Sequence, residues 1–289
     1  MNNLRRDLVL YLRSLYENGR SKNTISAYKQ DLVAFLKFLE AENIRQWPDQ
    51  KTDIQAFLKR QETYKKASSS IARLISSLRN FYQWLARNQI QRINPMLEID
   101  APKIERSQAE ILTTQEVKAI IEQIDDSSIL GKRDRAIIEL LYATGIKVSE
   151  LTTLKQEYWH QTLSLLKVVP TSGPARIIPV SPLASKALAS YLESRQNIQV
   201  EEIFLNNRQE KMTRQAVWSL IKQYCSKAKI TKKVTPNTWR QTFTLQTMKN
   251  GGDWRVIQEI LGKTDPNITM PLSQQEIVAN YQDNFPDWS

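Results

Sequence analysis

Hydrophobic side chains in the first third of the chain recur every three or four residues, the spacing of one face of an α-helix. Four such runs follow one another, over residues 4–18, 21–39, 52–58 and 68–85. Gly, Ser and Thr at the ends of these runs are typical helix stop and start residues. Helices with one apolar face bury that face against one another. The pattern therefore predicts a four-helix bundle over residues 1–92.

The hydrophobic pattern changes twice after this bundle. Residues 93–110 contain Pro95 and Pro102 and show no sustained periodicity, which is typical of a linker. Helical spacing returns at residue 111, and two β-rich runs, 162–169 and 175–180, flank a short turn. The predicted fold is therefore mainly α in two domains. The second domain, over residues 111–289, is an α+β unit with a small antiparallel sheet.

Charge adds a candidate partner to this picture. The 289 residues include 41 Lys and Arg against 30 Asp and Glu, a formal net charge of +11. Residues 1–103 hold 18 of these cations and 10 of the acids, which leaves +8 on the first domain. A basic domain indicates a polyanion such as nucleic acid, although a merely solvated basic surface is the alternative. The candidate phosphate contacts are Arg20, Lys22, Lys29, Lys65, Lys66, Arg73 and Arg79.

Several function classes find no support in the sequence. Cys225 is the single cysteine, which excludes an internal disulfide and a cysteine-based zinc site, and we expect no metal and no cofactor. No apolar run is long enough to span a bilayer, and none resembles a signal peptide. We therefore expect a cytoplasmic protein that associates with the nucleoid.

Three stretches of the second domain carry motifs. They are Ala143-Thr144-Gly145-Ile146-Lys147-Val148-Ser149-Glu150-Leu151, then Arg176-Ile177-Ile178-Pro179-Val180, and then residues 235–272. Together they resemble the catalytic domain of the tyrosine recombinase (phage integrase) family, in its bacterial Xer-like form. The first domain is similar to the core-binding, SAM-like domain of the same family. The resemblance implies the two-domain fold predicted above and an activity on duplex DNA.

The resemblance also implies where six catalytic side chains should lie, and five of them differ. Lys147 stands in place of the first arginine, Thr171 in place of the hairpin lysine, and Asn237 in place of the first histidine. Lys263 replaces the second histidine, and Leu272 replaces the tyrosine nucleophile. Arg240, the second arginine, is present. We therefore predict a catalytically degenerate member.

The resemblance predicts a protein that binds duplex DNA without cleaving it. The expected contacts at the phosphate are Lys147, Arg176, Arg240 and Lys263. One alternative is an active recombinase or integrase with atypical residues, in which Tyr281 would be the displaced nucleophile. Another is a regulatory subunit that partners an active recombinase. By resemblance, the C-terminal tail would dock on a neighbouring subunit, giving a homo-oligomer or a mixed complex.

Overall fold

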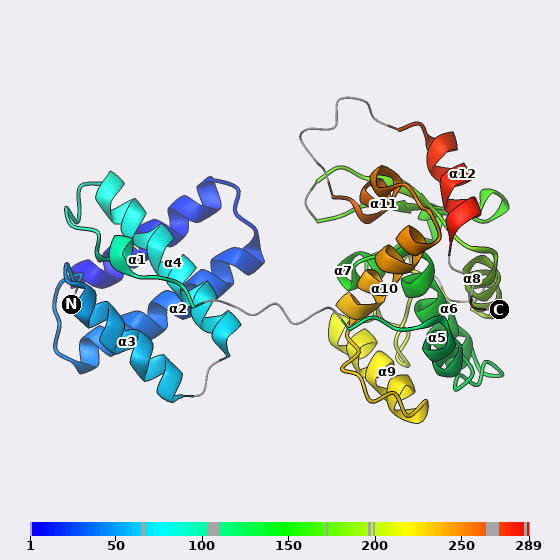
Figure 1. The fold of residues 1–289 in the computed structure, drawn as a ribbon, viewed down its shortest axis with the longest axis horizontal. Coiled ribbons are helices and arrows are strands. Elements are labelled where there is room, and N and C mark those ends of the chain that lie inside the picture. The colour runs from blue at the N-terminus through cyan, green and yellow to red at the C-terminus, as the bar shows by residue number, and fades with distance from the viewer. Residues whose placement is uncertain are drawn as a thin grey trace. The chain divides into compact units, whose positions relative to one another are not determined.

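The fold is that of a computed structural model, which describes residues 2–64, 67–102, 110–171, 173–195, 198, 200–263, 272–285 and 288. The chain separates into two compact units, residues 1–107 and 108–289 (Figure 1). The finer boundaries of the expected linker, residues 93–110, stay a prediction.

The first unit is the predicted four-helix bundle. Its helices are α1 (Asn2–Glu17), α2 (Lys22–Ala41), α3 (Lys51–Thr63) and α4 (Ser68–Arg87), and a short 3-10 helix, η1 (Pro95–Glu98), follows. Aromatic rings fill the centre: the ring of Phe35 lies 4.9 Å from that of Phe57, and the ring of Trp47 lies 4.7 Å from that of Phe81. Rings at these distances add about 0.5–1.5 kcal/mol per pair beyond their buried area.

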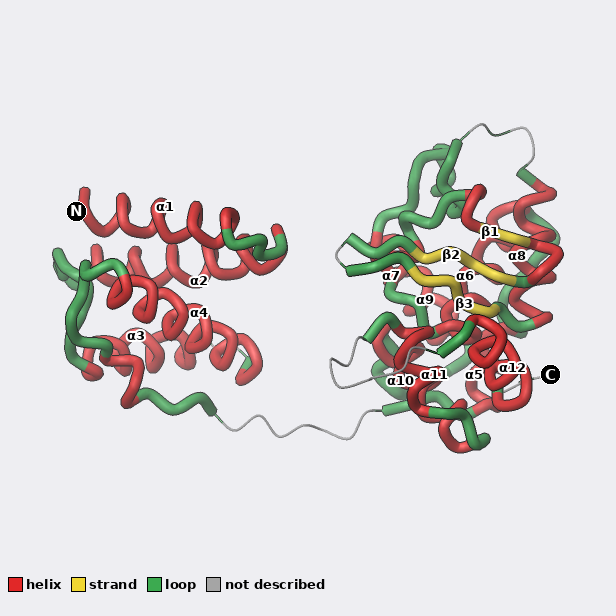
Figure 2. The backbone as a smooth tube through the Cα atoms, turned by 90° about the horizontal axis from the view of Figure 1, so that it is seen from above, coloured by secondary structure: helices red, strands yellow, loops and turns green. Residues whose placement is uncertain are grey.

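The second unit places helices around a three-stranded sheet (Figures 1 and 2). Its elements are α5 (Thr114–Ile121), α6 (Ile129–Thr144), α7 (Val148–Leu151), η2 (Gln156–Tyr158), β1 (Trp159–His160), η3 (Gln161–Leu163), β2 (Leu165–Val168), β3 (Arg176–Pro179), α8 (Pro182–Ser194), α9 (Arg214–Lys227), α10 (Pro236–Lys249), α11 (Trp254–Leu261) and α12 (Gln274–Asn284). The strand order is β1-β2-β3, antiparallel throughout. This confirms the predicted fold class.

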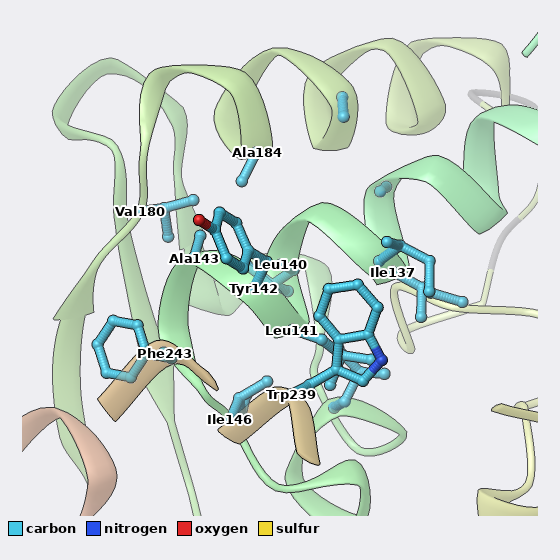
Figure 3. Packing of buried hydrophobic residues seen from close by; sticks show 14 of the residues in the cluster. Ile137, Leu140, Leu141, Tyr142, Ala143, Ile146, Val180, Ala184, Trp239 and Phe243 are labelled. Atoms are coloured by element: carbon cyan, nitrogen blue, oxygen red, sulfur yellow. The ribbon is translucent and has the colours of Figure 1, made fainter. Parts of the chain in front are cut away.

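Helix α6 is the centre of the second unit. Nine consecutive residues, from Ala136 to Thr144, are buried, and the helix contacts both α8 and α10. Figure 3 shows Leu141 of α6 beside Trp239 of α10, and the rings of Tyr142 and Trp239 lie 6.3 Å apart. A helix that is apolar all round must lie inside a domain. The end of α6 is therefore held firmly, and the first motif begins there.

The sheet differs from the sequence prediction in one respect. The run over residues 162–169, predicted as one strand, is interrupted at Ser164, whose φ of 49° lies in the left-handed region. Residues before it form η3, and β2 starts at Leu165. The two-residue strand β1 pairs with β2 on the other side, with Trp159 opposite Leu166. Such a short strand has too few residues to show an alternating pattern.

Candidate phosphate-binding site

Gly145 ends α6 two residues before the site residue Lys147. It does so with a φ of 57°, as predicted from its place after the last apolar residue, and a Cβ here would lie 2.8 Å from Cδ1 of Phe243. The chain then turns sharply, so that Ile146 is buried and Lys147 is exposed. The Lys147 backbone N–H donates to Oε2 of Glu150 at 3.0 Å. Lys147 therefore projects from the surface at the start of α7.

Arg240 lies in the first half of α10, which begins with the predicted cap: Thr235 Oγ1 accepts from the backbone N–H of Thr238. The half-buried Arg240 donates from Nη1 to the carbonyl of Gly145 at 2.7 Å and from Nη2 to the carbonyl of Leu261 at 2.6 Å. Burial lowers the pKa of Arg240 below its usual range, because the charged form loses hydration. The guanidinium thus joins the carboxyl ends of α6 and α11.

Arg176 and Glu150 form a buried ion pair next to Arg240. Nη1 of Arg176 donates to Oε1 of Glu150 at 3.0 Å and Nη2 to Oε2 at 2.9 Å, while Nε donates to the carbonyl of Ile260 at 2.7 Å. Only 10% of the Arg176 side chain and 4% of the Glu150 side chain are exposed. Burial alone would raise the pKa of Glu150, but the hydrogen bonds and charge of Arg176 outweigh it and hold that pKa below its usual range.

Lys263 and Asn237 are both exposed. Lys263 follows Gly262, whose φ of 62° ends α11 as predicted, and its Nζ lies 5.7 Å from the centre of the Trp254 ring. Asn237 lies in the first turn of α10. At the two positions where the family carries histidines, the structure thus offers an amide and an ammonium group. Neither group is the imidazole that the resemblance implies at these positions.

Leu272, which by resemblance stands at the position of the tyrosine nucleophile, is an apolar residue. Leu272 is half-buried and packs against the hydrophobic core of the second unit. It lines a groove of about 400 Å³ together with Lys167, Arg176, Ile177, Glu259 and Gln274. Thr171, at the position of the hairpin lysine, is exposed between β2 and β3. A threonine there supplies no cation and no general acid.

Tyr281, the candidate displaced nucleophile, is buried. Its hydroxyl donates to the carbonyl of Ala143 at 2.8 Å, and its ring stacks on Phe285 at 5.1 Å. Burial raises the pKa of Tyr281 well above its usual value. The described tail residues also lie on their own chain, since Nε1 of Trp288 donates to Oε2 of Glu139 at 3.0 Å. In this arrangement the hydroxyl of Tyr281 is inaccessible to a phosphate.

The candidate cations of the first unit fall into two groups. Arg20, Lys22 and Lys29 are exposed, as a phosphate contact requires. Arg73 and Arg79 are exposed as well, and each also makes a contact within the first unit: Arg73 pairs with the buried Asp31 at 3.0 Å, and Nη2 of Arg79 donates to the carbonyl of Ile99. Their part as phosphate contacts stays a prediction. Lys65 and Lys66 lie outside the described residues.

One basic segment of the second unit lies outside the three motifs. The 42 residues from Lys211 to Gly252 contain nine Lys and Arg and no Asp or Glu. On α9, Arg214, Trp218 and Lys222 follow one another at helical spacing, and all three are exposed. Arg214 and Trp218 line a broad, open groove with Val148, next to Lys147. A count of acids along the sequence would have found this segment.

Two negative findings concern the described residues only. None of their helices has both the length and the apolar character needed to cross a membrane. Within the same part of the chain, no group of three or more His, Cys, Asp or Glu side chains is arranged to hold a metal ion.

Comparison with known proteins gives a consistent result. The chain matches the model of the phage integrase family over residues 110–272 and that of the phage integrase N-terminal SAM-like domain over residues 8–89. It is 37% identical to the tyrosine recombinase XerD of Lacticaseibacillus casei, over 99% of both chains.

Two solved structures share the fold at 18% sequence identity. One is a lambda integrase dimer bound to a COC′ core site, with a TM-score of 0.72 over 93% of this chain and 98% of that one. The other is the Tn1549 transposon integrase in complex with circular intermediate DNA, with a TM-score of 0.71 over 95% and 94%. On the strength of the two family models and of the XerD relative, this chain belongs to the tyrosine recombinase (phage integrase) family.

Proposed function

We propose that this protein binds duplex DNA at the phosphate-binding site and does not cleave it. The observation that carries the proposal is a contrast between two positions of the site. Arg240 is held in place by two backbone carbonyls, whereas Leu272 stands, by resemblance, where the family has its nucleophile. The first can hold a phosphate and the second has no atom that attacks one.

The chemistry of the family reaction explains why binding and cleavage separate here. Cleavage needs a tyrosine hydroxyl to attack, two arginines on the phosphate oxygens, and histidine and lysine side chains that move protons. Each acid–base group contributes about 10²–10⁴ in rate. Lys147 keeps the positive charge of the first arginine but lacks the planar fork that grips two oxygens at once. Charge alone supports binding better than it supports a transition state.

Several observations support DNA as the partner. The Tn1549 integrase of similar fold is in complex with DNA. In this chain, Lys147 and Lys263 are exposed at the site, and Arg214, Trp218 and Lys222 extend the basic surface along α9. Cations that neutralise phosphates supply most of sequence-independent DNA affinity, and an exposed indole can stack on a base. Binding to DNA would keep the protein at the nucleoid.

Assembly is the second part of the proposal. The lambda integrase of similar fold is a dimer on its core site. We infer that more than one copy of this chain, or this chain with a partner recombinase, occupies one DNA target.

A salt titration tests DNA binding. The affinity for a fluorescent random-sequence duplex should fall linearly on a log–log plot of affinity against salt concentration. Each neutralised phosphate contributes about −0.9 to the slope, so several contacts give a slope of about −3 or steeper. The matched measurement uses a Lys147→Ala, Lys263→Ala double variant. Its slope should be shallower by about 1.8, because two phosphate contacts are lost. A slope near zero for the unaltered protein would refute DNA as the partner.

A further inference from the structure

The Arg176 guanidinium is bound inside the protein through all three of its nitrogens. Its Nε, Nη1 and Nη2 atoms are all engaged, with the Ile260 carbonyl and with the two oxygens of Glu150. Only a tenth of the side chain is exposed. A residue that the motif marks as a phosphate contact is therefore directed into the protein.

The Arg176 side chain covers the carboxyl end of α11. Its Nε binds the carbonyl of Ile260, the neighbouring Leu261 carbonyl is bound by Arg240, and cations are favoured at this end of a helix. The fit is close: a Cβ on Gly262 would lie 2.9 Å from Nη1 of Arg176. Lys263 comes directly after this glycine, and its backbone N–H donates to the carbonyl of Gln258 at 3.0 Å.

Glu150 links this helix end to the start of α7. The carboxylate accepts both terminal nitrogens of Arg176 and also the backbone N–H of Lys147. The ion pair is therefore connected to Lys147 through the Lys147 backbone N–H, and to the helix end that precedes Lys263 through the Ile260 carbonyl. Two arginines stand against one buried carboxylate, so the cluster keeps a net positive charge facing the site.

We propose that Arg176 is a positioning residue, which fixes Lys263 relative to Lys147 through its ion pair with Glu150 and its bond to Ile260. The idea rests on the proposed function, because it assumes that Lys263 contacts a DNA phosphate. A two-pronged, planar guanidinium is needed to hold a carboxylate and a carbonyl at once. Lysine at this position keeps the charge and loses that geometry.

A double-mutant cycle on the full chain tests the proposal. The affinity for the random-sequence duplex is measured for the unaltered protein, Arg176→Lys, Lys263→Ala and the double variant, with thermal melting of each. Lys263→Ala should weaken binding about tenfold in the unaltered background, as expected for loss of one charge-assisted hydrogen bond. In the Arg176→Lys background, the same substitution should change the affinity less than about twofold, because Lys263 is already displaced.

The other outcomes overturn the proposal. Effects that multiply across the cycle would make Arg176 a direct contact. An unchanged affinity for Arg176→Lys with an intact Lys263 effect would make it a residue of the fold alone. If Arg176→Lys does not fold, Glu150→Gln takes its place in the cycle, since the amide keeps the shape of the carboxylate and loses the ion pair. Absence of salt-dependent binding by the unaltered protein would instead refute the proposed function.

Discussion

At the scale of single residues, Arg240 has a structural task as well as a place in the site. Its two terminal nitrogens hold the carbonyls of Gly145 and Leu261, which end α6 and α11. Hydrogen bonds from a charged donor contribute about 1.5–3 kcal/mol each. Arg240→Ala should therefore lower the free energy of unfolding by about 3–6 kcal/mol and also weaken DNA binding.

Urea denaturation and a DNA titration of the same sample separate the two effects of Arg240→Ala. Lys263→Ala is the matched control, because its side chain is exposed and its loss should reduce affinity with unchanged stability. An unchanged free energy of unfolding in Arg240→Ala would show that the two carbonyl contacts do not stabilise the fold.

Residues whose structural role depends on their near neighbours in sequence were predictable. Residues whose role depends on a contact with another helix or strand were not. Gly145 and Gly262 were recognised as helix ends because a left-handed residue after an apolar run is a local feature. Arg73, a predicted phosphate contact, also pairs with Asp31 on another helix. Nothing in the spacing of exposed cations tells which of them has a buried acid opposite. The pair of Arg176 with Glu150 escaped prediction for the same reason.

At the scale of elements, α9 is the helix whose role depends most on its exposed face. Arg214, Trp218 and Lys222 lie on that face, and the helix contains no acid. Arg214→Ala should reduce the slope of the salt titration by about 0.9, and Trp218→Ala should weaken binding about tenfold through lost stacking. The exposed Lys186 of α8 provides the matched control, since Lys186→Ala removes one charge from a helix away from the site residues. Equal effects at Arg214 and Lys186 would mean that only net charge matters.

The helices were predicted well because the capping residues and the apolar periodicity of each segment indicate the same helix. Thr113 and Glu116 form the expected reciprocal cap of α5, and α10 begins at Pro236. The sheet was predicted less well. Ser164 adopts a left-handed conformation that a serine only rarely takes, so the break before β2 has no sequence signal.

At the scale of the whole molecule, the chain keeps the fold of the family, and the loss of the cleavage chemistry is our proposal. The second unit keeps the frame of the family, including the helix ends that bring Lys147, Arg240 and Lys263 to one site. By resemblance, the side chains on that frame differ at five of the six catalytic positions. The frame depends on buried contacts such as those of Tyr142 and Trp239, which the cleavage chemistry does not use. The loss of cleavage that we propose would leave these buried contacts unchanged.

The most direct measurement of the central claim is a covalent trapping assay. The unaltered protein and Leu272→Tyr are each incubated with duplex DNA from a mapped binding site, nicked near the expected cleavage position so that a phosphotyrosyl adduct accumulates. We expect no covalent protein–DNA band from either, because catalytic groups that act as one unit are not restored by returning a single member. The positive control is an active family member on its own nicked site. A covalent band from the unaltered protein would contradict the account, and the linked residue would identify the nucleophile.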